Sequence, residues 1–479
     1  MKRVGIFVAS EQKGFLISLA LQFEKILGLM VTIIARDKHI VNLAKKILPL
    51  DNNINVVNYS EIPIKLNYNS VFEQAKRIES VYKVSLSMLI SEDRALGQGY
   101  LSNVQKIPDI KRASWQYDKK IKYFVSEFIK KEMALDGLNI AIQIWPNKIV
   151  TKICKAKGID CFSFVPIKFG DRRFWSDDEF ISGSAYIKRI KNYLNNNKDK
   201  EILNYESHKW SENINKSAKY SYTKATKSAL KVVVNDSKKF IRGTNKKDSY
   251  HYLGWLPSIF RSVSNYKYIK NNSIFPKDLS GYKVVLFNLH MEPEVALQYF
   301  SPEFSNSFEA ITWISKSLPV NYLIVVKEQA FSFGVRSRWY YKQLRKIPNV
   351  VLSHPDVHSW EWIQLSDIVA TITGTVGQEA VNFEKPVLSF GKHQVVNYLP
   401  TVYYVSNYAE TNSALNQIIH NPMSKDIYKK SRVVLSNAQV DSSIDMPDYS
   451  QAVKSENLET TMASKAIKNL VKEYPSIFN

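Results

Sequence analysis

The sequence predicts an α/β protein made of two Rossmann-like halves that face each other across a cleft, with a helical basic insertion in the first half. Strand-like apolar runs alternate with helical segments, which indicates parallel sheets with crossover helices. The 479 residues are too many for one ordinary core. The strands of the second half are almost entirely apolar, as expected where helices cover both faces of a parallel sheet.

The first half opens with a strand, a helix and a strand, in the runs RVGIFVAS, FLISLALQFEKILG and MVTIIAR. A third strand, NINVVNYS, precedes two helical stretches, and NIAIQIWPN and IDCFSFVPIKFG then continue the sheet. We assign residues 1–275 to this N-terminal domain, in which we expect the acceptor to bind. Residues 177–245 are helical, charged and poor in strand formers, and we interpret them as an insertion or a helical bridge.

The net charge is +22, from 66 basic and 44 acidic residues, and basic residues are densest at about 188–247. One interpretation is a solvated helical face. The other is a surface that binds an anionic membrane, at about 1 kcal/mol per basic residue near the lipid. We do not expect nucleic acid as a partner, because no motif of nucleic-acid-binding proteins accompanies the charge.

The second half has a cleaner pattern of alternating strands and helices. Its strands are YKVVLFNLH, NYLIVVKEQ, NVVLSHP, DIVATIT, KPVLSFG and TVYYVSN, and the segments between them are long enough for right-handed crossovers. We assign residues 276–425 to a C-terminal domain that binds the nucleotide. Residues 426–479 form a helical tail that we expect to pack back on the first domain.

Several classes of protein are excluded by simple features. Cys154 and Cys161 are too few for a disulfide framework or a zinc site. The apolar run at residues 14–34 contains Glu24 and Lys25 and is divided by Gly28, so we interpret it as a helix and a strand and not as a membrane span. The N-terminus is typical of a first strand and not of a signal peptide. We expect a cytoplasmic protein, peripheral on the inner face of the plasma membrane if the basic segment binds lipid.

Polar side chains at the strand ends of the second half mark the expected site. In open parallel sheets, ligands bind at the carboxyl ends of the strands, where the strand order reverses. His290, Lys327, His354, Thr373 and Gly391 follow five of the predicted strands. We expect these strand ends to converge on one cleft.

The stretch TITGTVGQEAVNFEKPVLSFG at residues 371–391 joins two strands through a turn and a helix. Gly374 permits a tight turn, Gly377 permits a close approach of the backbone to a ligand, and Thr375 is a suitable helix cap. Free amides there can hold a phosphate, and Glu379 can accept hydrogen bonds from a ribose diol. An ordinary strand–turn–helix connection explains the spacing equally well, and neither a P-loop nor a dinucleotide fingerprint is present.

Two other polar groups follow strands of this half. His290, Glu292 and Glu294 in NLHMEPEVA have the chemistry of a general base or of ligands to sugar hydroxyls. Lys327 and Glu328 end the next strand, where a lysine can neutralise a phosphate. Solvated polar loops are the alternative interpretation of both groups.

The first half contributes two charged segments that we expect to be loops. SEDRALGQGY contains Asp93 and Arg94, and KFGDRRFWSDDEF contains Arg172 and the acidic residues 177–179. Arginines in loops can hold carboxylates or phosphates in a bidentate way. The acidic pairs lack the further ligands of a metal site, so we predict no bound metal.

The segments 319–329 and 346–391, together with NLHMEPEVA, resemble the capsular-polysaccharide biosynthesis family of bacterial surface-glycan glycosyltransferases. SEDRALGQGY and GDRRFWSDD look like motifs of its first half. The resemblance implies a GT-B fold, a nucleotide-activated sugar on the C-terminal half and an acceptor on the N-terminal half. The grouping includes enzymes that transfer Kdo from its CMP form.

The resemblance also implies roles for individual residues. The donor-nucleotide residues would be Thr373, Gly374, Thr375, Gly377, Glu379, Lys327 and Glu328. His290, Glu292 and Asp93 are our candidates for acid–base catalysis, and Arg94, Arg172 and Glu294 for contacts to acceptor or phosphate. Gln329 and Ala330 stand where the family has histidine and proline, so another group, such as His354 or His393, would have to replace that histidine.

These observations predict a metal-independent glycosyltransferase of hexosyl or Kdo type, with a CMP- or UDP-sugar as substrate and no cofactor. The acceptor would be a glycan or glycolipid of capsule, O-antigen or lipopolysaccharide. The alternatives are a nucleotide-sugar 2-epimerase of the same fold and a non-catalytic component of a glycan-assembly complex.

Overall fold

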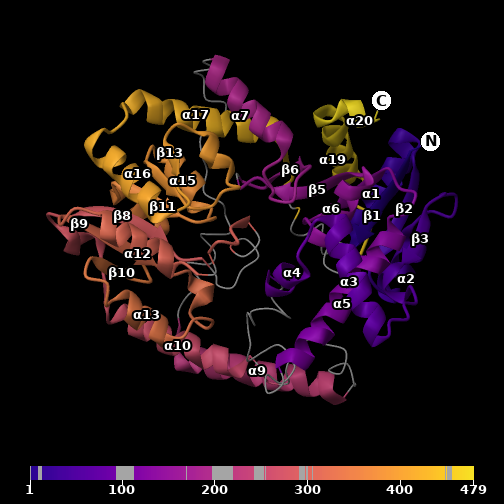
Figure 1. Ribbon diagram of the computed structural model, residues 1–479, viewed down its shortest axis with the longest axis horizontal. Coiled ribbons are helices and arrows are strands. Elements are labelled where there is room, and N and C mark those ends of the chain that lie inside the picture. Colours follow the sequence, from indigo (N-terminus) through magenta and orange to yellow (C-terminus); the bar gives the residue numbers. More distant parts are fainter. Residues whose placement is uncertain are drawn as a thin grey trace.

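The computed structural model describes residues 2–8, 13–92, 113–168, 170–196, 220–241, 253, 255–290, 297, 300–304, 306–447, 449 and 456–478. Two seven-stranded sheets organise the chain, and Figure 1 shows them in the two halves of the molecule, each surrounded by helices. The predicted α/β class with two Rossmann-like domains is confirmed.

The first sheet has the order β14-β6-β5-β4-β1-β2-β3. Its strands β1 to β5 are parallel, whereas β6 pairs antiparallel with β5 and with β14. The strand order therefore reverses between β1 and β4. The elements of this half are β1 (Arg3–Val8), α1 (Lys13–Leu27), β2 (Met30–Ala35), α2 (Lys38–Ile47), β3 (Asn55–Asn58), η1 (Tyr59–Glu61), α3 (Tyr68–Tyr82), α4 (Leu86–Glu92), α5 (Ala113–Ala134), β4 (Ile140–Gln143), α6 (Lys148–Lys157), β5 (Asp160–Pro166), β6 (Arg172–Ser176) and α7 (Ser184–Asn196). Two further helices follow in the chain, α9 (Tyr222–Ile241) and α10 (Leu256–Lys270). Helix α10 packs on the second half, where Asn265 donates to the carbonyls of Phe333 and Arg336.

The second sheet is parallel throughout, in the order β13-β12-β11-β8-β9-β10-β7. Here the order reverses between β8 and β11. Its elements are β7 (Ser273–Ile274), η4 (Pro276–Leu279), β8 (Lys283–Asn288), α12 (Phe308–Ser317), β9 (Tyr322–Lys327), η5 (Ala330–Ser332), α13 (Arg338–Leu344), β10 (Val350–Ser353), α14 (Ser359–Leu365), β11 (Ile368–Thr371), α15 (Val376–Asn382), β12 (Val387–Ser389), η6 (Val395–Tyr398), β13 (Val402–Tyr404) and α16 (Tyr408–His420).

Local sequence explains where these elements begin and end. All four residues of β4 and of β11 are buried, in agreement with the three consecutive apolar residues with which each strand begins. Helix α6 begins where the Asn147 side chain accepts a hydrogen bond from the Val150 amide, and it ends at Gly158 with φ +67°. The apolar run that follows residue 13 divides into α1 and β2 as predicted. Within the described residues, no helix is both long and apolar enough to cross a membrane.

The segment GDRRFWSDD differs from the expected loop. Arg172–Ser176 form strand β6, because Phe174 and Trp175 are almost completely buried and their neighbours pair with β5. The indole of Trp175 donates to the carbonyl of Ala466 in the C-terminal tail (2.8 Å). The expectation failed because the run of charges around these aromatics hides a short strand.

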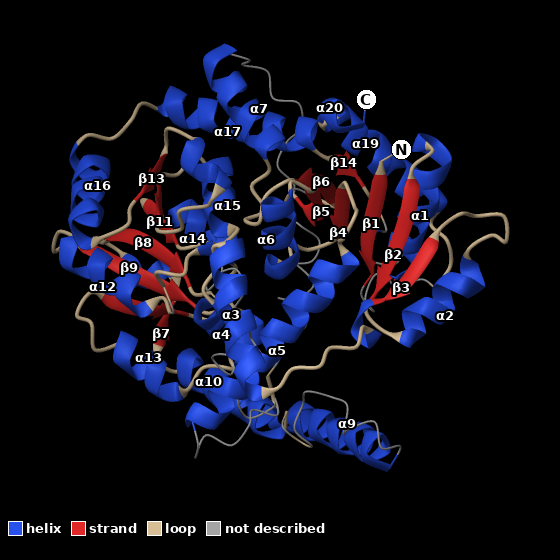
Figure 2. Cartoon of the chain, turned by 45° about the vertical axis from the view of Figure 1, so that its right-hand side comes forward, coloured by secondary structure: helices blue, strands red, loops and turns tan. Residues whose placement is uncertain are grey.

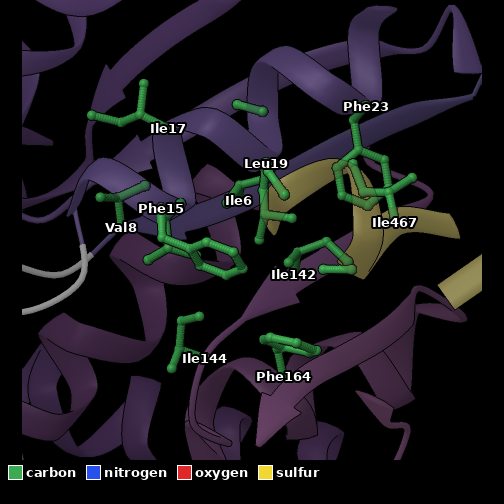
Figure 3. Close-up of a cluster of buried hydrophobic side chains, with 14 of the residues drawn as sticks. Ile6, Val8, Phe15, Ile17, Leu19, Phe23, Ile142, Ile144, Phe164 and Ile467 are labelled. Carbon is green, nitrogen blue, oxygen red and sulfur yellow. The ribbon is translucent and has the colours of Figure 1, made fainter. Parts of the chain in front are cut away.

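The C-terminal tail returns from the second domain to the first. It consists of α17 (Lys425–Ser442), β14 (Ile444–Asp445), α19 (Thr460–Glu473) and α20 (Pro475–Phe478). Helix α17 packs on α7 between the two halves, β14 extends the first sheet, and α19 packs on α1 (Figure 1). Figure 3 shows Ile467 of α19 in one apolar cluster with Phe23 of α1 and Ile142 of β4.

A shared apolar core joins the two domains. Val165 and Phe174 of the first sheet belong to the same buried cluster as Val376 and Ala380 of α15 and Leu435 of α17. This core is supported by a bidentate pair between Arg189 of α7 and Glu473 of α19, with N–O distances of 2.5 and 2.8 Å. The relative placement of the domains therefore depends on the tail.

Arg172 is one of the polar ties between β6 and the tail. Its guanidinium donates to the Ser443 hydroxyl (2.8 Å), the Ser443 carbonyl (2.9 Å) and the Val440 carbonyl (3.0 Å). The contacts that the guanidinium makes are thus structural, and the acceptor or phosphate contact that the sequence suggested stays a prediction.

Arg172→Lys should lower the free energy of unfolding by about 1–3 kcal/mol, because an ammonium cannot reproduce the fork of hydrogen bonds. Denaturant unfolding measures the change. Arg345→Lys, at an exposed arginine of the second domain, is the matched control. Equal unfolding midpoints for the Arg172 variant and wild type would show that these hydrogen bonds contribute nothing to stability.

Candidate functional site

The strand order of the second sheet brings the ends of β8 and β11 together. His290 lies just beyond β8 and Thr373 just beyond β11. The Thr373 amide donates to Nε2 of His290 at 3.0 Å. Two residues separated by 83 positions in the sequence therefore meet where the strand order reverses, at the edge where parallel sheets bind ligands.

This contact fixes the protonation state of His290. The ring is 3% exposed, and burial together with the charge of Arg336 lowers its pKa to about 3. Because Nε2 accepts a hydrogen bond, the proton of the neutral ring resides on Nδ1, which has no partner among the described residues. A ring with a low pKa and an occupied Nε2 is poorly suited to be a general base, so the geometry favours a positioning role.

A buried ion pair lies behind His290. Arg336 donates to Glu328 at 2.5 Å and also to the carbonyl of His290. Tyr341 donates its hydroxyl to the same carboxylate oxygen of Glu328 at 2.7 Å. Glu328 therefore fixes the position of the Arg336 guanidinium, which in turn donates to the backbone at the end of β8. Arg336 carries no motif and lies two residues before α13, which begins at Arg338, so it could not be singled out from the sequence.

Lys327 points to a different partner. Its ammonium donates to the Val357 carbonyl at 2.6 Å, in the loop that follows β10. Burial lowers its pKa to about 8, while the carboxylates of Glu328, Glu361 and Asp356 oppose that shift. The two residues of the predicted lysine–glutamate pair are both internal to the domain, and Lys327 as a phosphate ligand stays a prediction.

Some of the backbone amides in the turn at residues 373–377 already donate hydrogen bonds within the protein. The Thr373 amide is taken by His290, and the Gly374 amide donates to the Thr371 hydroxyl at 3.0 Å. The amides of Thr375 and Val376 have no acceptor among the described residues. A phosphate cradle would therefore consist of these two amides and not of the whole turn.

The two glycines of the turn are required for packing. A Cβ on Gly374 would lie 2.9 Å from Oγ1 of Thr371 and 3.3 Å from Nε2 of His290. A Cβ on Gly377 would lie 3.1 Å from Cγ2 of Thr371, so this glycine lets α15 approach β11 closely. The structure thus shows an approach of Gly377 to the sheet, and its close approach to a ligand stays a prediction.

Glu379 lies in the first turn of α15, and this helix is on the side of the second domain that faces the first (Figure 2). The Thr375 hydroxyl donates to its Oε1 at 3.2 Å. Burial raises the pKa of Glu379, whereas hydrogen bonds from Thr375 and Trp360 and the charge of Lys168 lower it. Lys168 follows β5, so a residue of the first domain contributes to the electrostatics of this turn.

The neighbouring residue Gln378 also connects the turn to the first domain. The Gln439 side chain of α17 donates to Oε1 of Gln378 at 3.1 Å and to the Ile167 carbonyl at 3.5 Å. Lys168 directly follows Ile167. The turn therefore lies at the junction between the two domains, a frequent position of ligand sites.

Other predicted residues lie elsewhere. Asp93, Arg94, Glu292 and Glu294 fall outside the described residues, and their proposed roles stay predictions. His354 stacks on Phe275, with ring centroids 4.0 Å apart.

His393, the other candidate for the missing family histidine, makes a contact between the domains. It stacks on Phe180 of the first domain at 3.5 Å, with an interplanar angle of 1°. Among the described residues, no group of three or more histidine, cysteine, aspartate or glutamate side chains could hold a metal ion.

The first domain has a cavity of about 380 Å³ at the corresponding edge of its sheet. Residues from the ends of β1, β2 and β4 line it, and they include Val8, Arg36 and Trp145. Lys131 and Glu127 of α5 form an ion pair of 2.5 Å in its wall. This cavity could not be predicted from the sequence, because its lining comes from separate segments without a common motif.

His290 should make stability depend on pH. Its folded pKa of about 3 lies below the ordinary 6.5, so between these values the unfolded chain binds a proton that the folded chain does not. The stability that the neutral ring supplies is complete above pH 6.5 and is lost as the pH falls toward 3. His290→Asn removes this dependence. The stability gap between wild type and the variant should therefore narrow below pH 6.5, by at most about 1.4 kcal/mol per pH unit.

Urea unfolding of both proteins at a series of pH values from 7 to 4 tests this expectation. A gap that stays constant over the series would contradict a neutral, buried His290.

No family model matches this sequence, and the search of curated proteins found no match. Among solved structures, the chain is similar to the UDP-GlcNAc 2-epimerase of Neisseria meningitidis bound to UDP-GlcNAc, with 12% identity, a TM-score of 0.26 and 98% and 100% of the two chains covered. It is similar to a glycosyltransferase of Rickettsia africae, with 11% identity, a TM-score of 0.30 and 100% and 99% covered. It is also similar to the β-Kdo 2,7 transferase KpsC of Thermosulfurimonas dismutans, with 13% identity, a TM-score of 0.32 and 72% and 89% covered. TM-scores this low carry no argument, so the fold rests on the strand order described above.

Proposed function

We propose that this protein is a glycosyltransferase that moves a sugar from a nucleotide-activated donor to a glycan or glycolipid acceptor in the synthesis of a surface polysaccharide. The observation that carries the proposal is the turn after β11. It combines the Glu379 carboxylate with two backbone amides that have no acceptor among the described residues. Its backbone is fixed by the hydrogen bond to His290, at the point where the sheet reverses its strand order. The sequence resemblance to surface-glycan transferases supports the same function.

The donor would bind with its ribose on Glu379 and its phosphate on the amides of Thr375 and Val376. A carboxylate that accepts hydrogen bonds from both ribose hydroxyls binds more strongly than a neutral acceptor. Amides held in place before the reaction stabilise the charge that develops on the leaving phosphate without reorganisation. We propose metal-independent transfer on this basis, with a CMP- or UDP-sugar as donor.

The acceptor would bind in the cavity of the first domain. Trp145 is about half exposed there and offers an aromatic face to a sugar ring, while Arg36 and the pair of Lys131 and Glu127 offer hydrogen-bond partners. A cavity in the first domain, in addition to the turn after β11 in the second, favours a reaction with two substrates over epimerisation of one. Removal of the acceptor proton requires a base, for which Asp93 and Glu292 remain the candidates.

A thermal-shift screen over CMP, UDP, GDP and their sugars tests nucleotide binding directly, because a ligand that binds the folded state raises the unfolding temperature. The proposal expects one nucleotide class to give a clear shift. No shift with any compound would favour the non-catalytic alternative. Conversion of UDP-GlcNAc to its 2-epimer without an acceptor, observed by NMR, would favour the epimerase.

Glu379→Ala should weaken binding of the selected nucleotide by about 10- to 100-fold, because a hydrogen bond to a charged group contributes about 1.5–3 kcal/mol. Isothermal titration calorimetry measures the affinity. Glu309→Ala is the matched control, since Glu309 is an exposed glutamate in the first turn of α12. Equal affinities for the Glu379 variant and wild type would show that this carboxylate only favours the start of its helix.

A further inference from the structure

Helix α9 lies at the edge of the molecule and packs mainly on α10 (Figures 1 and 2). Ala225 and Ala229 on its inner face are 5% and 8% exposed. The helix has 20 residues, so it is about 30 Å long. Its outer face is therefore a long surface that the described residues leave open to solvent.

This outer face carries an apolar stripe. Leu230, Val234 and Ile241 are 60%, 50% and 82% exposed. Spacings of four and seven residues place them on one side of an α-helix. Single exposed apolar residues are ordinary on protein surfaces. Three in one row on the outer face of a helix indicate a surface that interacts with another apolar partner.

A row of lysines runs beside the stripe. Lys227, Lys231 and Lys238 each precede one of the three apolar residues by three positions, and all three are exposed. The one acidic residue of the helix, Asp236, accepts a hydrogen bond from the Leu253 amide at 3.0 Å and is half-buried. The outer face thus combines apolar side chains and positive charge without a carboxylate.

We propose that this face of α9, defined by Lys227, Leu230, Lys231, Val234, Lys238 and Ile241, docks on an anionic lipid bilayer. Apolar side chains can enter the boundary between headgroups and acyl chains, while adjacent lysines bind the anionic headgroups. A second copy of the same face would bring lysines against lysines. Nucleic acid would match the charge but leave the apolar stripe in water.

The docking proposal does not depend on the proposed function, because none of its residues belongs to the sites described above. If both hold, α9 would bring the enzyme to the surface where lipid-linked acceptors are found. The two proposals can fail separately, since one is tested with vesicles and the other with soluble nucleotides.

Cosedimentation of the full chain with vesicles tests the proposal. The protein should bind phosphatidylcholine vesicles that contain phosphatidylglycerol, and should not bind vesicles of phosphatidylcholine alone. Binding should weaken as salt is added, because exposed charges are screened. The variant K227Q/K231Q/K238Q should lose about 100-fold in affinity, at about a factor of five per lysine. The variant L230Q/V234Q/I241Q should keep only a weaker binding that disappears at high salt.

The control variant K45Q/K46Q/K76Q removes the same charge from exposed lysines of α2 and α3 and should bind like wild type. Unchanged thermal midpoints would confirm that all variants fold. Equal loss in the control and the α9 variant would assign binding to overall charge and overturn the proposal. Equal binding to neutral vesicles would also overturn it. A dimer in sedimentation velocity that L230Q/V234Q/I241Q converts to monomer would assign the face to a second copy instead.

Discussion

The carboxyl edge of the second sheet depends on the buried ion pair between Arg336 and Glu328. Both side chains are almost completely excluded from solvent. Such a pair adds little net stability, but removal of one partner leaves a buried charge and is very costly. Here the pair specifies a conformation, because the same guanidinium also holds the His290 carbonyl, and the His290 ring holds the Thr373 amide. Three strand ends are thereby fixed relative to one another.

The same edge is fixed from the other side by backbone packing. A Cβ on Gly391, at the end of β12, would lie 2.1 Å from the Ile372 carbonyl oxygen, so the chain can pass there only without a side chain. Helix α15 approaches β11 over Gly377, and the Gln439 side chain of α17 then donates both to Gln378 of α15 and to the Ile167 carbonyl. The turn is therefore connected on one side to the second sheet and on the other, through α17, to the first domain.

Sequence predicted the parts of this arrangement that depend on local pattern. The apolar strands of the second half, the turn after β11 and the meeting of His290 with Thr373 follow from periodicity and from the rule for parallel sheets. The partners of Arg172 and the contact of Arg336 with the His290 carbonyl could not be predicted, because many residues separate them and neither arginine belongs to a pattern that indicates its partner. Strand β6 was missed because its length is only five residues and charged segments flank it.

A donor phosphate is negatively charged, so the proposed site would need a positive group near it. The two cations of the second domain that lie at these strand ends are occupied internally, Arg336 by Glu328 and Lys327 by the Val357 carbonyl. Lys168 of the first domain also acts on this turn, because its charge lowers the pKa of Glu379. Binding of a nucleotide sugar at the turn would then involve both domains, because the second supplies the amides and the carboxylate while the first contributes the charge of Lys168. The C-terminal tail, which holds the two domains together through α17, would be as important for donor binding as the turn itself.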